Sequence, residues 1–367
     1  MLWQTRTMSA HASPPLANVA SCREISENRE QVDAWENIEF PAGTLLDGRF
    51  LIGEPLTQGG MATIYQAEDM KNGGCPVVVK VPFERFQRDP AFVARFLREE
   101  AIGLKLHHPS LLKFFSVEGK KGRLYLVTER LSGITLAQLI HRQKPLPEAD
   151  ALRIASLVGE GLQYMHEHNF VHRDIKPDNI MLCTDHTIRI MDFGLASPVA
   201  GKLDLLADKT PVFGTPQYMA PEQVKRSRSG PHTDIYSLGV ILYEMLTGKL
   251  PFIHEDPWVC AQSRVQGDPP APRSVNPAIS PQAEEIVLRA LRRKPAERYP
   301  TMAAFRAALD APDKVVVTGL SQRLRPPRWV LSFEQAQIVY GLGLTVIVLI
   351  LLVIGFFFFL HLPTKHH

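Results

Sequence analysis

Apolar residues between positions 50 and 82 fall into short runs on either side of a glycine-rich turn. Residues 50–53 and 63–67 flank the sequence Thr-Gln-Gly-Gly-Met-Ala at positions 57–62, a pattern that predicts a β-hairpin. A valine run at positions 77–79 ends at Lys80, which indicates a buried strand with a lysine at its end. Because glycines let backbone N–H groups approach phosphates closely, the turn is a candidate phosphate-binding loop, although an ordinary hairpin loop has the same pattern.

The segment from position 92 to 106 has apolar residues at helical spacing, which predicts an amphipathic helix. It carries two adjacent acidic residues, Glu99 and Glu100, and one of them can reach Lys80. Further along, residues 124–128 and 187–191 indicate strands, and residues 146–168 indicate a second helix. A segment that begins at Asp234 is mostly apolar on every side, which is typical of a buried helix.

The two ends of the chain lack this regular pattern of apolar and polar residues. Residues 1–44 are largely polar and have no sustained period, which predicts a flexible segment. Residues 310–337 contain three prolines and several basic residues, which indicates a linker. The core-forming unit is therefore expected to occupy residues 45–309.

Residues 338–360 carry no charge, and a helix of that length spans about 34 Å, enough for a hydrocarbon core of about 30 Å. This pattern predicts a transmembrane helix. Arg323, Arg325 and Arg328 precede the span, whereas only Lys365 follows it. The positive-inside rule therefore places the preceding domain in the cytoplasm, with residues 361–367 as a short extracytoplasmic tail.

Composition narrows the functional class. Hydrophobic residues make up 45% and charged residues 22% of the 367 residues, which suits a protein that forms a core. The net charge is only +3, so nucleic acid is not an expected partner. The four cysteines show neither metal-ligand spacing nor a disulfide framework, and they fit a reducing cytosol.

The clearest chemistry lies at positions 172–179, which read His-Arg-Asp-Ile-Lys-Pro-Asp-Asn, and at 192–194, which read Asp-Phe-Gly. Transfer of a γ-phosphoryl group needs a carboxylate that orients and deprotonates the acceptor hydroxyl, and oxygen ligands that hold Mg²⁺. Asp174 has the side chain for the first task, and Asn179 and Asp192 have those for the second. A strand-like segment separates these two predicted metal ligands, as a two-ligand site requires.

Together with Gly59-Gly60-Met61 and the run Gly-Thr-Pro-Gln-Tyr-Met-Ala-Pro-Glu at 214–222, these motifs resemble those of bacterial serine/threonine protein kinases of the eukaryotic-like (Hanks) type. The resemblance implies an α+β fold with a β-rich N-lobe and a helical C-lobe that close over ATP. It also implies phosphorylation of Ser and Thr hydroxyls on proteins, autophosphorylation, and Mg²⁺ or Mn²⁺ as the metal.

The resemblance assigns roles to individual side chains. Asp174 would be the catalytic base, and Lys176 would contact the transferred phosphate. Lys80 would bind the α- and β-phosphates while paired with Glu99, the better candidate of the two glutamates. Thr215 would recognise the substrate hydroxyl, and with Lys176 it favours Ser or Thr over Tyr as acceptor.

Other residues receive binding or structural roles from the same resemblance. Glu222 is expected to pair with Arg298, and Asp234 is expected to brace the catalytic loop. The residues expected to contact ATP are Leu56, Thr57, Gln58, Gly59, Gly60, Met61, Ala62, Thr63, Ile64, Lys80, Glu129, Leu131 and Met181.

Thr210 lies between the Asp-Phe-Gly and Ala-Pro-Glu motifs and is the first candidate for an activating phosphosite, with Ser197 as the second. Arg173, directly before the predicted base, can pair with a phosphate on this segment. The simpler reading is that Thr210, which precedes Pro211, is a surface turn residue.

Thr57 and Ala62 stand where the family has the first and third glycines of its loop. This departure favours an alternative function, a pseudokinase that acts as a membrane-tethered scaffold, although Lys80, Asp174 and Asp192 are all present. For an active enzyme we expect protein substrates, a cognate Ser/Thr phosphatase and a second copy for trans-autophosphorylation as partners. The expected location is the cytoplasmic membrane, crossed once.

Overall fold

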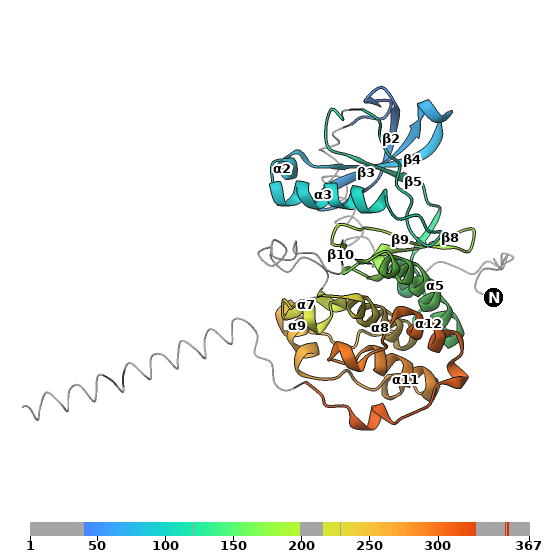
Figure 1. Cartoon of the computed structure of the whole chain (residues 1–367), viewed down its shortest axis with the longest axis vertical. Coiled ribbons are helices and arrows are strands. Elements are labelled where there is room, and N and C mark those ends of the chain that lie inside the picture. Colours follow the sequence, from blue (N-terminus) through green and yellow to red (C-terminus); the bar gives the residue numbers. More distant parts are fainter. Residues whose placement is uncertain are drawn as a thin grey trace, which may run out of the picture.

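A computed structural model describes residues 40–119, 121–198, 216–227 and 229–327, together with Leu349 and Leu351. The chain forms two lobes, a β-sheet lobe with two helices at its side and a larger helical lobe (Figure 1). The two-lobed α+β fold expected from the sequence is therefore confirmed. The predicted membrane span at 338–360 lies outside the described residues except for two positions. Among the helices that are described, none combines the length and the apolar character needed to cross a bilayer.

The N-lobe is an antiparallel sheet whose strands lie side by side in chain order. The glycine-rich turn joins the second and third strands, as the hairpin prediction requires. Residues on one face of this sheet form a small core that includes Phe50, Tyr65 and Val79. The strands are β1 (Leu45–Leu46), β2 (Phe50–Gln58), β3 (Ala62–Asp69), β4 (Cys75–Pro82) and β5 (Leu126–Glu129).

Residues 40–44 are the last part of the predicted N-terminal segment, and they are packed on this sheet. Gly43 N donates to Ile52 O, and Ile52 N donates to Thr44 O, each at 2.8 Å. The ring of Phe40 meets the ring of Tyr65 edge-on. Residues 1–39 lie outside the described part of the chain.

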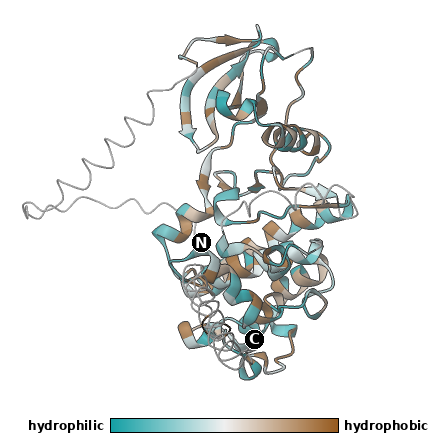
Figure 2. Cartoon of the chain, turned by 90° about the vertical axis from the view of Figure 1, so that its left-hand side faces the viewer, coloured by the Kyte–Doolittle hydropathy of each residue, from teal (hydrophilic) through white to brown (hydrophobic). Residues whose placement is uncertain are grey.

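Helix α3 (Pro90–Gly103) lies beside the sheet and follows the short helix α2 (Glu84–Gln87). It begins where Asp89 accepts a hydrogen bond from Ala91 N, and Pro90 suits the first helical position because its missing N–H would be unpaired there. Figure 2 shows mainly hydrophobic residues along this helix. Its buried face carries Phe92, Phe96 and Glu99.

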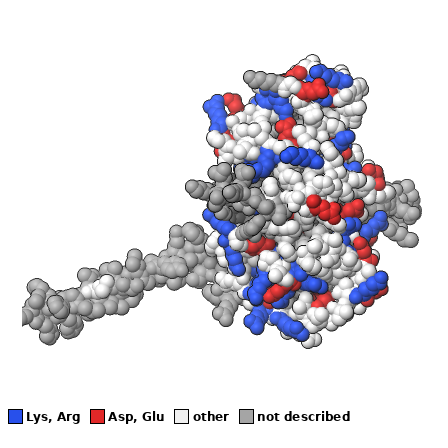
Figure 3. All heavy atoms as spheres, viewed as in Figure 1, with Lys and Arg blue, Asp and Glu red and all other residues white. Residues whose placement is uncertain are grey.

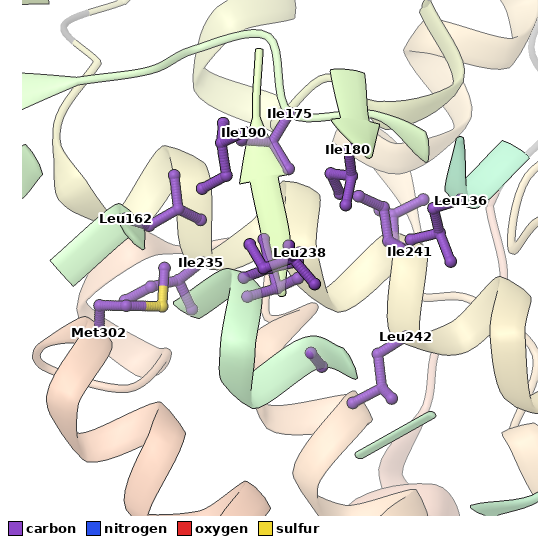
Figure 4. Packing of buried hydrophobic residues seen from close by; sticks show 14 of the residues in the cluster. Leu136, Leu162, Ile175, Ile180, Ile190, Ile235, Leu238, Ile241, Leu242 and Met302 are labelled. Carbon is purple, nitrogen blue, oxygen red and sulfur yellow. The ribbon is translucent and has the colours of Figure 1, made fainter. Parts of the chain in front are cut away.

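The C-lobe is built around α5 (Glu148–Glu167) and α8 (Pro231–Thr247). Helix α8 is buried on nearly every side, as its apolar sequence predicts. Figure 4 shows Ile180 and Ile190 above Leu238 and Ile241 of this helix, so the core directly supports the strands that flank the predicted site. The surrounding helices are α4 (Leu136–Arg142), α7 (Pro221–Val224), α9 (Pro257–Gln266), α10 (Pro272–Val275), α11 (Pro281–Ala290) and α12 (Met302–Asp310).

Two small sheets lie at the junction of the lobes. One contains β6 (Gly133–Thr135), β8 (Ile180–Cys183) and β9 (Ile188–Ile190), and the other pairs β7 (Phe170–Val171) with β10 (Ser197–Pro198). After α12 the chain continues through two 3-10 turns, η5 (Pro312–Lys314) and η6 (Leu320–Arg323), which contact α11. This part of the predicted linker is thus packed on the C-lobe as far as residue 327.

Candidate active site

The loop at residues 172–179 connects β7 to β8 and is held from below by one carboxylate. Asp234, at the start of α8, accepts hydrogen bonds from His172 N at 3.0 Å, Arg173 N at 2.8 Å and His166 Nε2 at 2.7 Å. Burial alone would raise the pKa of Asp234, but these donors lower it, so the carboxylate is ionised. The expectation that Asp234 braces the loop is confirmed.

Asp174 lies at the tip of this loop. Its carboxylate is 3.3 Å from the Lys176 ammonium, and Asn179 Nδ2 donates to its backbone oxygen at 2.9 Å. The turn η2 (Pro177–Asn179) reverses the chain and so brings the three side chains together. Burial raises the pKa of Asp174, the Asp192 carboxylate adds to this effect, and the Lys176 ammonium opposes it. A raised pKa makes Asp174 a stronger base than an exposed aspartate.

Asn179 and Asp192 are neighbours because of strand pairing. Asn179 directly precedes β8, Asp192 follows β9, and the two strands are antiparallel. The bond from Met191 N to Asn179 O, 2.8 Å long, closes this end of the hairpin. The loop and the Asp-Phe-Gly segment therefore meet at one point.

Asn179 and Asp192 can both offer side-chain oxygen atoms at this point. Asn179 uses its Nδ2 on the loop, so its side-chain oxygen is the atom that it can offer to a cation. Burial would raise the pKa of Asp192, but the Lys80 ammonium and a bond from Gly194 N lower it, so the carboxylate is ionised. Ionised carboxylate and amide oxygens are suitable ligands for Mg²⁺. The residues present therefore fit the magnesium ion that the sequence motifs imply.

Asp192 has a φ of 64°, which non-glycine residues adopt only when the surroundings enforce it. Its neighbour Phe193 is fully buried. The Phe193 ring lies 5.6 Å from the ring of Phe114 and 5.8 Å from the ring of His172. This packing anchors the segment and fixes the direction of the aspartate.

Lys80 enters the site from β4. Its ammonium lies 3.0 Å from both carboxylate oxygens of Glu99 on α3. Burial would lower the pKa of Lys80, but the Glu99 and Asp192 carboxylates raise it above its usual value. Glu100, the other candidate, points to a different side and pairs with Lys121.

The glycine-rich turn lies between β2 and β3. A Cβ added at Gly60 would meet no atom within 4 Å, and one at Gly59 would come no closer than 3.7 Å to Ala62 O. Packing against the described residues therefore does not demand glycine at either position, and the absence of side chains leaves room for a phosphate to approach the backbone. Neither Thr57 nor Ala62 has a positive φ, so the two departures from the family pattern introduce no backbone strain.

The other residues expected to contact ATP lie on the same turn and at the lobe junction. Glu129 uses its carboxylate on Lys113 N and on Arg189, and its backbone N–H on Lys113 O, so a contact to adenine would have to come from its carbonyl oxygen. Exposed members are Leu56, Thr57, Gly59, Gly60 and Met61; half-buried members are Gln58, Ile64, Lys80, Glu129, Leu131 and Met181; buried members are Ala62 and Thr63.

Two predicted residues, Thr210 and Thr215, lie outside the described residues. Ser197 is described, and its hydroxyl is buried in β10 without a hydrogen-bond partner in the described part of the chain. A kinase could reach this hydroxyl only if β10 separated from β7. Ser197 is therefore a poor acceptor in this conformation.

Three supporting contacts were not predicted from the sequence. Gln223 Nε2 donates to Arg173 O at 2.8 Å, which ties α7 to the catalytic loop. Lys121 holds Glu100 and so fixes the outer side of α3. Arg264 is fully buried in α9 and donates to Met219 O at 2.8 Å. The buried Glu222–Arg298 pair, with a distance of 2.7 Å, was expected and is confirmed.

A two-lobed fold in which a lysine–glutamate pair, a loop aspartate and two oxygen ligands converge defines the protein kinase class. The chain belongs to the protein kinase domain family, and the sequence pattern of this family matches residues 50–309. The bacterial Hanks type expected from the sequence is also confirmed, because the chain is similar to serine/threonine-protein kinases of bacteria.

The chain is 36% identical over 268 residues to the serine/threonine-protein kinase PknB of Mycolicibacterium smegmatis, and the match covers 72% of this chain and 43% of that protein. It is 35% identical to a probable serine/threonine-protein kinase of Streptomyces coelicolor, over 72% of this chain and 40% of that protein. It is 35% identical to PknL of Mycobacterium tuberculosis, over 73% of this chain and 66% of that protein. The chain thus spans less than half the length of PknB.

Proposed function

We propose that this protein transfers the γ-phosphoryl group of ATP to Ser and Thr hydroxyls on proteins. One observation carries the proposal: the Lys80–Glu99 pair, the Asp174 carboxylate and the oxygen ligands Asn179 and Asp192 meet at the lobe junction. These are the parts that phosphoryl transfer needs.

The roles follow from charge and position. Lys80 would bind phosphate oxygens while Glu99 fixes its direction. Asp174 would accept the proton of the acceptor hydroxyl, and its raised pKa suits this task. Lys176, 3.3 Å from Asp174, would stabilise negative charge on the transferred group. A magnesium ion held by Asn179 and Asp192 would neutralise phosphate charge when bound.

We further propose that residues 338–360 anchor the enzyme in the cytoplasmic membrane with the kinase lobes in the cytoplasm. The length and uncharged composition of this segment support the anchor, and the arginines before it support the orientation. If so, the full chain should resist carbonate extraction from membranes, and a chain truncated before Ile338 should be extracted. Release of the full chain would refute the anchor.

The activity is tested with purified protein, labelled ATP, Mg²⁺ and a generic protein acceptor, followed by phosphoamino acid analysis. Wild type should label Ser and Thr, and Asp174→Asn should keep ATP binding but lose about 10²-fold or more in turnover. Label on Tyr alone would contradict the acceptor class. Mass spectrometry of the incubated enzyme would show whether Thr210 is autophosphorylated, and Thr210→Ala would show whether that phosphate activates.

The scaffold alternative has one observation in its favour, the presence of Thr57 and Ala62 in the glycine-rich turn. The same assay separates the two functions. A scaffold would bind partners, and the wild type would turn over no faster than Asp174→Asn.

A further inference from the structure

The segment that follows α12, residues 311–327, is bound to the C-lobe, and we call it the C-terminal strap. Glu285 of α11 accepts hydrogen bonds from the Thr318 hydroxyl and from Leu320 N. Further along, Arg325 N donates to the Asp268 carboxylate at 2.9 Å, and Asp268 N donates to Arg325 O at 2.7 Å. The strap is thus fixed at two points by carboxylates that bind its backbone.

The end of the strap fits tightly. A Cβ added at Gly267 would lie 2.1 Å from Pro327 N, so only glycine at 267 allows the strap to approach. Because Gly267 follows α9 directly, the chain leaves the C-lobe beside this helix. Pro327, beside Gly267, therefore marks the place where the chain leaves the C-lobe.

Basic residues lie on the elements that adjoin this exit. Arg293 donates to the Asp268 carboxylate that also binds the strap, so Arg293 and Arg325 flank the same residue. Arg289 lies one helical turn beyond Glu285 on α11 and is exposed. Figure 3 shows several Lys and Arg side chains at the lower end of the C-lobe, with Asp and Glu side chains between them. The strap contacts α11, and we call the basic residues of α11, of the turn after it and of the strap the basic face: Arg289, Arg292, Arg293, Lys294, Arg323 and Arg325.

Acidic residues beneath this face offset part of its charge. Glu284 and Glu285 are 7% and 6% exposed, and backbone N–H groups hold both of them. Two carboxylates oppose the six basic residues directly, since Asp268 binds Arg293 and Glu297 binds Arg292 and Lys294. With Glu284 and Glu285 counted as well, six positive charges less four negative charges leave a net charge of two on the face.

We propose that the basic face binds the anionic headgroups of a lipid bilayer. The proposal rests on the membrane anchor proposed above. Ten residues, 328–337, separate the end of the strap from the predicted span, and ten residues reach at most about 35 Å. The anchor therefore holds the basic face close to a bilayer, and the polyanion that it meets first is the lipid surface.

This contact would orient the kinase. The strap and α11 lie at the end of the C-lobe opposite the N-lobe (Figure 1), so a bound C-lobe directs the N-lobe away from the bilayer. The acceptor hydroxyls within reach would then belong to proteins held at the same membrane surface.

The test uses residues 40–327, without the anchor. This fragment contains both hydrophobic cores of the lobes, so we expect it to fold without the anchor. It is sedimented with vesicles of phosphatidylcholine alone, or with vesicles that also contain roughly 30% of the anionic lipid phosphatidylglycerol. We expect binding to the anionic vesicles only, and loss of binding in about 1 M salt, where charges are screened beyond about 3 Å.

Charge variants show which surface binds. One basic residue near an anionic surface strengthens binding about fivefold, so Arg323→Gln with Arg325→Gln should weaken it about 25-fold. Arg323→Lys with Arg325→Lys keeps the charge and should retain binding. Lys71→Gln with Lys105→Gln removes two exposed charges from the N-lobe and should change binding little.

Equal weakening by the N-lobe pair would mean that net charge, not the basic face, drives binding. Binding to neutral vesicles, or none to anionic ones, would also overturn the proposal, and capture of an acidic protein but not of vesicles would assign the face to a protein partner. Failure of the anchor is a separate result, because carbonate extraction of the full chain reports it and the fragment lacks that segment.

Discussion

Asp234→Asn tests whether the bond network under the catalytic loop supports catalysis as well as stability. The carboxylate is fully buried and serves three donors, with Oδ2 bound to His166 and His172 and Oδ1 bound to Arg173 N. Asparagine has the same shape but only one acceptor oxygen. If that oxygen accepts the hydrogen bonds from His166 and His172, the amide NH₂ must face the Arg173 N–H, and two donors then meet.

The cost can be worked out from these contacts. A buried N–H without a partner costs about 1–3 kcal/mol, and replacement of charge-assisted bonds by neutral ones adds about 1 kcal/mol. Arg173 has a φ of 69° and relies on the lost bond to hold this conformation. We therefore expect about 2–4 kcal/mol of lost stability and a relaxed Arg173 backbone.

Relaxation at Arg173 moves the next residue, Asp174. Because a misplacement of about 1 Å can cost about 10²-fold in rate, kcat should fall by about that factor. The KM for ATP should change only a few-fold, since Lys80 and Glu99 do not contact Asp234. The melting temperature should fall by about 5–15 °C, as expected for about 2–4 kcal/mol in a domain of this size.

Steady-state kinetics and thermal unfolding of the same preparations measure both effects. Asp185→Asn is the matched control, because it makes the same chemical change in an exposed turn where Thr187 is the partner. A variant with a lower melting temperature and the wild-type kcat would refute the link between the network and the catalytic loop. A variant unchanged in both would show that the hydrogen bonds contribute nothing.

Three further predictions concern individual ion pairs and the predicted base. Lys80→Met should lower kcat/KM by about 10²-fold or more in the phosphorylation assay, because phosphate binding and the pair with Glu99 are both lost; normal turnover would mean that another lysine binds the phosphates. In the pH profile of kcat, the acid limb should lie above the usual aspartate pKa of about 4, because burial raises the pKa of Asp174 and the protonated form cannot accept a proton. Lys176→Gln should move that limb to still higher pH, since the ammonium lowers this pKa, and a shift to lower pH would contradict the assignment. Arg298→Met should destabilise the protein by about 3–5 kcal/mol in chemical unfolding, because the buried Glu222 loses its partner, and adding Glu222→Gln should recover part of the loss; no recovery would place the effect in the other bonds of Arg298.

The core of the site could be predicted because its residues are close in sequence or joined by simple pairing. Asn179 and Asp192 flank an antiparallel hairpin, so their proximity follows from two strand predictions. The choice between Glu99 and Glu100 also has a physical basis. Glu99 lies three residues after Phe96 on the buried face of α3, whereas Glu100 is turned about 100° away from it.

The supporting contacts could not be predicted in the same way. Gln223 and Arg264 bind backbone oxygens of distant segments, and any residue offers such an oxygen. Hydrophobic period and motif spacing carry no information about which carbonyl a polar side chain will meet. A buried arginine such as Arg264 therefore looks like a surface residue until the fold is known.

The strap shows the same limit with a larger consequence. Prolines and basic residues after position 309 indicate a linker, but Asp268 and Glu285 bind its backbone, and no residue type in the strap signals that contact. If residues 338–360 span the membrane as proposed, docking shortens the tether from the 27 residues at 311–337 to the ten at 328–337. For a flexible tether the r.m.s. length then falls from about 29 Å to about 17 Å. Effective concentration falls as about the −3/2 power of tether length, so docking raises that of the C-lobe at the bilayer about fourfold. Binding of the basic face to lipid is strengthened by this factor. The gain depends on Asp268 and Glu285, two buried carboxylates that hold the strap and contact neither ATP nor lipid.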